Sequence, residues 1–129
     1  VKMADMGLGS ARKYSAERKA FGRPLVGFQV LLDRLAEMAT RLDVARTYVY
    51  QVAARLRDGE PCIAEAAMAK NAAVEAAVWI IDAALQIHGG YGYMRESLVE
   101  RLYRDIRLFD IGGGTREMMN EVIARRMEL

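Results

Sequence analysis

The sequence predicts an all-α protein, an antiparallel up-and-down bundle of three long helices followed by one or two shorter helices near the C-terminus. Apolar residues recur at steps of three and four over long stretches. Only two prolines interrupt the chain, and no segment alternates apolar and polar residues with the period of a strand. With 129 residues, of which 53% are hydrophobic, the chain is long enough for one domain with its own core.

The first helix is expected to run from near Met3 to the boundary that the letters FGRP mark at positions 21–24. Gly7 and Gly9 weaken a helix locally but do not forbid it. Helical spacing is under way without a capping residue or a loop before it. We therefore expect that the chain starts partway through a helix, as a domain taken from a larger protein would.

The second helix lies between the two prolines, Pro24 and Pro61, and carries one apolar stripe for about eight turns. Arg34, Glu37 and Arg41 lie on its opposite face. At about 1.5 Å per residue, such a helix is on the order of 48 Å long and needs partners of similar length. The stripe consists of Phe28, Leu31, Leu32, Leu35, Met38, Ala39, Leu42, Ala45, Val49, Val52 and Leu56.

The third helix, from Cys62 to about His88, contains ten alanines. Alanine favours a helix and lets neighbouring helix axes come close. Because several sides of this helix are apolar, we expect it to be buried on more than one face and to end at Gly89–Gly90. A loop, a shorter helix from Glu96 to about Leu108, three glycines and a last helix with Thr115 as its N-cap should follow.

Composition excludes several classes of protein. No apolar run approaches the roughly 20 residues that a membrane-spanning helix needs, and the first residues lack the pattern of a signal peptide. The only cysteine, Cys62, cannot form a disulfide within the chain, which fits a reducing compartment, and we expect a cytoplasmic protein. The net charge is +2, with 19 basic and 17 acidic residues intermixed, which argues against nucleic-acid binding. No metal site is predicted.

Two stretches could bind an anion or simply end a helix. In YSAERKAFGRPLVGFQ (14–29), the cations around Arg18 complement the dipole at a helix C-terminus. Alternatively, Arg18 could bind a phosphate through two N–H groups, with Gln29 adding an amide contact. In LQIHGGYGYM (85–94), His88 suits a capping or packing role. The glycines beside it could donate backbone N–H groups to phosphate oxygens, and the tyrosine rings could pack against a flat ring system of a ligand.

Two further stretches lie near the C-terminus. The charges of VERLYRDIRLFDIG (99–112) are interpreted as surface or inter-helix ion pairs. In DIGGGTREMM (110–119), the glycines form either a turn that needs positive φ or a loop that approaches a ligand closely before the helix N-terminus at Thr115. The spacing alone favours neither interpretation.

Four ordered blocks resemble the C-terminal helical domain of the acyl-CoA dehydrogenases over nearly the whole chain. They read ERKAFGRPL…FQ, EAAMAK, ALQIHGGYGYMRESLVERLYRDIR and IGGGTREMMNEVIARRM. The resemblance implies that residues 1–129 are this domain, without the N-terminal helical and middle β domains of complete members. It also implies a homo-oligomer, dimer or tetramer, that binds FAD, oxidises the α,β bond of an acyl-CoA thioester and passes electrons to an electron-transferring flavoprotein.

The resemblance also assigns roles by position. Arg18 matches the arginine that reaches the flavin pyrophosphate of a neighbouring subunit, with Phe21 beside it, and Phe28 and Gln29 match positions on the adenosine side. Thr115 and Glu117 match contacts to the flavin bound by their own subunit. The substrate side is assigned to Gly113 and Gly114, and a loop against the neighbour's cofactor to Gln86, Ile87, Gly89 and Gly90.

Gly113 departs from the commonest pattern of the family. Many members carry a glutamate there, two residues before the threonine, as the base that takes the α-proton. In this respect the sequence looks more like the isovaleryl and long-chain branches, whose glutamate lies on the first helix of the domain, upstream of the equivalent of Val1. We therefore name no catalytic residue in this chain. Glu117, the acid nearest to the glycines, matches a cofactor contact rather than the base.

Two alternatives stay open beside the dehydrogenase. A related flavoenzyme such as an acyl-CoA oxidase would be reoxidised by O₂ instead of a flavoprotein. A non-catalytic helical oligomerisation module would use the alanine-rich helix only for packing. As a dehydrogenase domain without its base and middle domain, the chain alone is expected neither to hold FAD tightly nor to turn over substrate.

Overall fold

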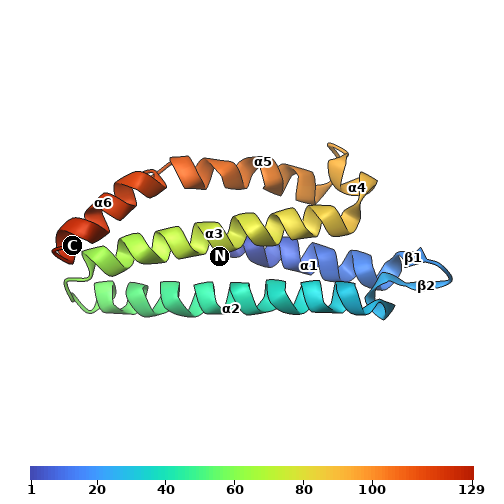
Figure 1. Ribbon diagram of the computed structural model, residues 1–129, viewed down its shortest axis with the longest axis horizontal. Helices are drawn as coiled ribbons and strands as arrows, with labels where there is room; N and C mark the ends of the chain where they lie inside the picture. The colour runs from blue at the N-terminus through green and yellow to red at the C-terminus, as the bar shows by residue number, and fades with distance from the viewer.

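A computed structural model describes residues 1–129 and shows an all-α bundle, which confirms the predicted fold class (Figure 1). The three long helices are α1 (Lys2–Glu17), α2 (Gln29–Arg57) and α3 (Ile63–His88). The C-terminal part consists of α4 (Gly90–Tyr93), α5 (Leu98–Ile111) and α6 (Arg116–Arg126). Between α1 and α2 lie the strands β1 (Lys19–Ala20) and β2 (Arg23–Pro24) and a 3₁₀ turn, η1 (Leu25–Gly27).

Helix α3 is the centre of the bundle and packs against α1, α2, α5 and α6. In Figure 1, α2 runs antiparallel along one side of α3, while α5 and α6 follow one another along the other side. The N-terminus lies near the middle of the bundle, so α1 accompanies only the half of α3 that ends at His88. None of the helices combines the length and the apolar character that a membrane crossing requires.

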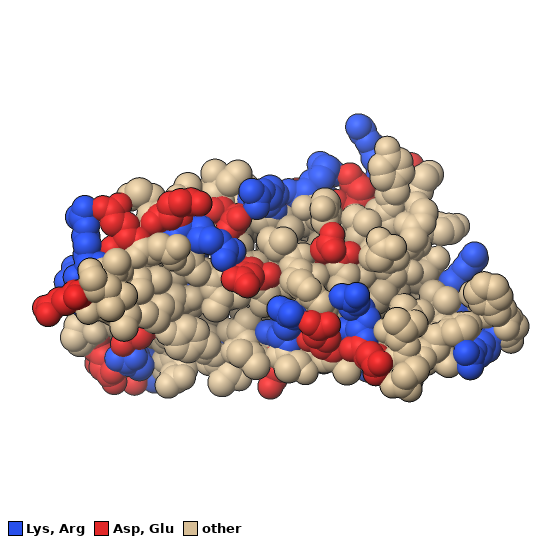
Figure 2. All heavy atoms as spheres, viewed as in Figure 1, with Lys and Arg blue, Asp and Glu red and all other residues tan.

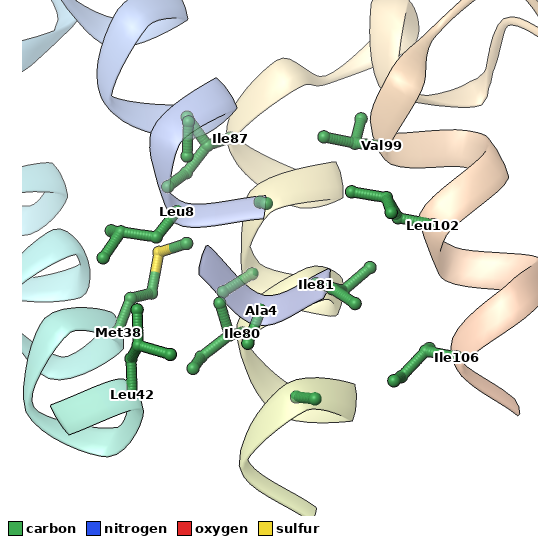
Figure 3. Close-up of a cluster of buried hydrophobic side chains, with 14 residues drawn as sticks. Ala4, Leu8, Met38, Leu42, Ile80, Ile81, Ile87, Val99, Leu102 and Ile106 are labelled. Carbon is green, nitrogen blue, oxygen red and sulfur yellow. The ribbon is translucent and has the colours of Figure 1, made fainter. Parts of the chain in front are cut away.

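The small side chains of α3 let its neighbours approach on several sides, as its composition predicted. Ala77 and Ala84 are almost fully buried, and Ile80 and Ile81 are completely buried. A Cβ added to Gly7 of α1 would lie 3.3 Å from Cγ1 of Ile81, which shows how closely α1 approaches α3. Figure 3 shows side chains of four helices meeting in this core. They are Ala4, Leu8, Met38, Leu42, Ile80, Ile81, Ile87, Val99, Leu102 and Ile106.

The segment between α1 and α2 forms a small hairpin that strand alternation did not predict. Lys19 pairs with Pro24 and Ala20 with Arg23 in antiparallel register. Phe21 and Gly22 form the tip with φ values of 50° and 82°, and the Phe21 side chain is 95% exposed. Two-residue strands are too short for a period-2 pattern, so this hairpin depends on the left-handed tip.

Helix boundaries agree with the prediction where a single residue sets them. Gly59 adopts a positive φ of 82° after α2, α3 ends at His88 before Gly89, and Thr115 caps α6. The tyrosine-containing loop, however, includes the short helix α4, and α5 starts and ends later than expected. No residue of α6 is fully buried, and Met118 and the C-cap residue Met127 are more than 50% exposed.

Basic side chains do not gather into one region on the face drawn in Figure 2, where Lys and Arg lie among Asp and Glu. This distribution agrees with the intermixed basic and acidic residues of the sequence.

Replacing Gly92 with alanine is expected to destabilise the fold, because the new Cβ would lie 2.5 Å from the backbone oxygen of Leu85. Backbone must move to relieve this contact, and we expect a loss of about 1–3 kcal/mol in the free energy of unfolding. Gly9→Ala is the control, because no atom lies within 4 Å of its added Cβ. Alanine should stabilise α1 there by about 0.5–1 kcal/mol. Urea unfolding followed by circular dichroism measures both changes, and equal stability of the two variants would contradict the prediction.

Candidate functional site

A groove at the C-terminal end of α3 brings four of the predicted site residues together. It has a volume of about 620 Å³ and contains Arg18, Ile87, Gly89 and Gly90 in its lining. We call it the diglycine groove. Its complete lining is Tyr14, Arg18, Leu25, Ile87, His88, Gly89, Gly90, Tyr91 and Met94.

Arg18 is held at this groove by its backbone. It follows the last residue of α1 in an extended conformation, and its N–H donates to the carbonyl oxygen of Tyr14 at 2.8 Å. Its own carbonyl oxygen accepts from the N–H of Leu25 at 2.9 Å. The guanidinium takes part in none of the ion pairs of the chain. An arginine without a carboxylate partner at the mouth of a groove is available for a bidentate contact to an anion.

His88 is a packing residue of the groove, as one of the two interpretations of its motif expected. The residue is 8% exposed, and its ring stacks on Tyr14 with the ring centroids 4.4 Å apart. Nδ1 lies 2.7 Å from the carbonyl oxygen of Ala84, so Nδ1 carries the hydrogen, because a carbonyl oxygen only accepts. Nε2 lies 3.1 Å from Oγ of Ser10 and joins α3 to α1.

The two glycines leave the backbone of the groove open. Gly89 has a φ of 57° and a ψ of −136°, a conformation that other residues rarely adopt. No atom lies within 4 Å of a Cβ added at Gly89 or Gly90. A ligand could therefore approach this backbone closely. The rings of Tyr14 and Tyr91, 6.3 Å apart, line the same groove.

Four of the residues predicted to contact the neighbour's flavin lie outside the diglycine groove. Gln86 is exposed and does not line it. Phe21 and Phe28 contact each other edge to face with ring centroids 6.3 Å apart. The guanidinium of Arg23 lies 4.0 Å from the centre of the Phe28 ring. Gln29 donates from Nε2 to Oδ1 of Asp33 at 2.7 Å. The hairpin and the start of α2 thus form a separate surface beyond Arg18.

The glycine turn between α5 and α6 needs its glycines for conformational reasons. Gly113 and Gly114 have φ values of 69° and 98°, which confirms the turn interpretation. A side chain at Gly114 would also collide with Cε of Met119, whereas no atom lies within 4 Å of a Cβ added at Gly113. Close approach to a ligand at Gly113 stays a prediction, and the open space there is compatible with it.

Side chains from three helices hold this turn. Lys70 of α3 donates from Nζ to the carbonyl oxygen of Gly114 at 2.7 Å. Arg116 of α6 pairs with Glu75 of α3 at 2.9 Å and with Asp110 of α5 at 3.5 Å. Asp110 also pairs with Arg107 at 2.8 Å, so the expected ion pairs of this segment are present. The roles of Lys70 and Glu75 were not predicted. The signal for Lys70 was a single lysine within an alanine-rich stretch.

Thr115 and Glu117 form the polar start of α6. Oγ1 of Thr115 accepts from the N–H of Met118 at 3.3 Å, which confirms the predicted N-cap. The pKa of the Glu117 carboxyl is lowered, first by the N–H of its own backbone and second by the Thr115 hydroxyl. Glu117 is therefore a weaker base than an ordinary glutamate, and its role as a cofactor contact rather than the base stays a prediction.

The two groups of predicted residues lie at different ends of the bundle. Lys70, which contacts the glycine turn, and His88, which lines the diglycine groove, are both on α3. At about 1.5 Å per residue, their positions are roughly 27 Å apart along the helix axis. In Figure 1, the junction of α5 and α6 lies correspondingly far from α4. One copy of the chain therefore does not gather both groups around one point.

Comparison with protein families gives a match to the acyl-CoA dehydrogenase C-terminal domain over residues 1–128. The 3-(aryl)acrylate reductase of Clostridium sporogenes is 44% identical over 97% of this chain and 33% of its own length. The human mitochondrial short-chain specific acyl-CoA dehydrogenase is 45% identical over 95% of this chain and 30% of its own length. The CarC subunit of the caffeyl-CoA reductase-Etf complex of Acetobacterium woodii is 42% identical over 96% of this chain and 33% of its own length.

Solved structures share the same fold. An acyl-CoA dehydrogenase from Geobacillus kaustophilus superposes with a TM-score of 0.96 and 40% identity, covering 98% of this chain and 33% of that protein. PigA, solved as an FAD complex, superposes with a TM-score of 0.91 and 28% identity, again covering 98% of this chain and 33% of that protein. This chain thus spans about a third of the length of the curated relatives that it matches.

The resemblance inferred from the four sequence blocks is therefore confirmed at the level of the family. The finer resemblance to the branches with glycine at position 113 stays a prediction. The order of the helices, the match over residues 1–128 and the superposition on solved dehydrogenases agree with one another. The chain belongs to the acyl-CoA dehydrogenase family and matches the C-terminal domain of that family.

Proposed function

We propose that residues 1–129 are the C-terminal domain of an FAD-dependent acyl-CoA dehydrogenase, which oxidises the α,β bond of an acyl-CoA thioester. The domain contributes to flavin binding across a subunit interface and to oligomerisation. The observation that carries this proposal is the unpaired Arg18 at a groove whose floor includes the open backbone of Gly89 and Gly90. The N–H groups of a guanidinium and of exposed glycine backbone can both donate hydrogen bonds to the oxygens of a pyrophosphate.

The donor set of the groove fits the FAD that PigA, a structural relative, contains. Arg18 would bind the pyrophosphate, with Ile87, Gly89 and Gly90 along the same wall. Phe21, Phe28, Gln29 and Gln86 would extend this surface toward the adenosine side. Bound FAD would supply the acceptor for the hydride that leaves the β-carbon.

We propose that Arg18 and the diglycine groove serve the flavin of a neighbouring copy, whereas Thr115 and Glu117 serve the flavin of their own copy. Two observations support a shared site. The two groups lie roughly 27 Å apart along α3, as estimated from the helix rise. The Phe21 ring at the hairpin tip is 95% exposed and has only Phe28 as an aromatic neighbour, which suits a second copy as its partner.

The α-proton requires a base that this chain does not provide at its glycine turn. Gly113 has no carboxylate, and hydrogen bonds lower the pKa of the Glu117 carboxyl, which makes it a weaker base. We propose that the base is a glutamate upstream of Val1 and that Gly113 and Gly114 line the substrate side. The open space at the Cβ position of Gly113 leaves room for a carboxylate from elsewhere. Exclusion of water and polarisation of the thioester carbonyl would then make the α-proton acidic enough to transfer.

We propose an electron-transferring flavoprotein as the electron acceptor, because the relative from Acetobacterium woodii is named as a subunit of a complex with Etf. Rapid flavin reoxidation by O₂ would favour the oxidase alternative instead. A cytoplasmic location agrees with the single, buried and unpaired Cys62.

Arg18→Ala in the full-length protein is expected to weaken FAD binding about 10-fold or more, because a charge-assisted contact to the pyrophosphate is lost. Flavin absorbance after dialysis and titration of the apoprotein with FAD measure the change. Arg12→Ala is the matched control, since Arg12 is exposed on α1 and does not line the groove. Loss of assembly with unchanged FAD affinity would favour the oligomerisation module.

Glu117→Gln is expected to lower the stability of the fold at pH 7 but not in acid. The folded-state pKa of Glu117 lies below its ordinary value of 4.5. The carboxylate therefore stabilises the fold above pH 4.5, and this contribution is lost as the pH falls through the lower folded value. Urea unfolding at pH 7 and well below pH 4.5 tests the change, with Glu96→Gln as an exposed control. A stability difference between Glu117→Gln and the wild type that persists unchanged in acid would refute the lowered pKa of the Glu117 carboxyl.

A further inference from the structure

Lys70 makes the only side-chain hydrogen bond to the backbone of the glycine turn at 112–114. Its Nζ donates to the carbonyl oxygen of Gly114 at 2.7 Å and connects positions 44 residues apart. Lys70 also lines an apolar groove of about 540 Å³, whose other lining residues come from the start of α1 and from α2, α3 and α5. A lysine in this setting can keep its methylenes beside apolar side chains while its ammonium group reaches the turn.

The turn itself contains little that would hold its position. Gly113 and Gly114 both have positive φ, and glycine restricts the backbone less than any other residue. The other links act on the flanking residues, through the ion pairs of Arg116 and Asp110 and the cap of Thr115. Only Lys70 fixes the Gly114 carbonyl, and with it the orientation of the peptide plane that leads into α6.

We propose that Lys70 is a positioning residue for the dehydrogenase reaction. Its hydrogen bond fixes the position and orientation of the Gly113–Gly114 backbone. Because this backbone lines the substrate side, the bond also determines how the substrate is placed there. This inference rests on the proposed function, in which the turn lines the substrate side. A hydrogen bond from an ammonium group is stronger than one between neutral groups, and its partly buried setting strengthens it further.

Lys70→Met in the full-length protein tests the proposal, because methionine keeps the apolar stem and removes the donor. We expect kcat per bound flavin to fall on the order of 10-fold or more, since small misplacements of a substrate-positioning element have effects of this size. Flavin content and thermal midpoint should change little. Lys70→Arg should recover part of the rate, and Lys13→Met, an exposed lysine on α1, should match the wild type.

Hydrogen exchange supplies a readout that does not depend on activity. Amides of residues 112–116 should exchange faster in Lys70→Met than in the wild type or in Lys13→Met. Unchanged exchange at the turn, or a loss of flavin and stability with kcat per flavin preserved, would overturn the positioning role. An active, flavin-containing wild type with an unaffected Lys70→Met variant would refute this inference alone. A wild type without flavin or dehydrogenase activity would refute the proposed function and this inference together.

Discussion

The close packing of alanine-rich α3 against four other helices is the constraint on which the rest of the structure depends. Because Ala77, Ala83 and Ala84 are small, α1, α2 and α5 approach the α3 axis on different sides, and Gly7 brings the backbone of α1 against Ile81. Bulky side chains at these positions would force the neighbours apart and open the core, at a cost of typically about 1–3 kcal/mol each. The same rigid helix carries Lys70 near one end and His88 at the other. It therefore fixes the separation between the glycine turn and the diglycine groove.

Much of the fold was predictable, because local chemistry sets the helices and several of their ends. The apolar period identifies α2 and α3, and the requirement for positive φ places the ends at Gly59 and Gly89. Thr115 is recognisable as an N-cap from its position alone. The hairpin at 19–24 was not predictable, since two-residue strands contain no alternation. The exposure of Met118 and Met127 was missed because an apolar period predicts a face without predicting what covers it.

The candidate site was predictable in part. Arg18, Ile87, Gly89 and Gly90 were grouped from their motifs, and the fold brings them into one groove. Gln86 lies next to this group in the sequence, but it falls on the exposed side of α3. Lys70 and Glu75 were missed because their contacts to the turn span more than forty residues, and they exist only once α6 has packed on α3. Such long-range contacts depend on tertiary structure, which local patterns do not specify.

The central claim is that one flavin site combines Arg18 of one copy with the glycine turn of another. Co-expression of two full-length variants, Arg18→Ala and Gly113→Phe, tests it most directly through flavin-linked dehydrogenase activity. Without added FAD, each variant alone should have little activity. In randomly mixed dimers, half of the molecules pair the two variants and hold one intact site, so about one quarter of the wild-type activity should return. No recovery in verified mixed oligomers would contradict the claim, because it would mean that both groups serve the same site from the same copy.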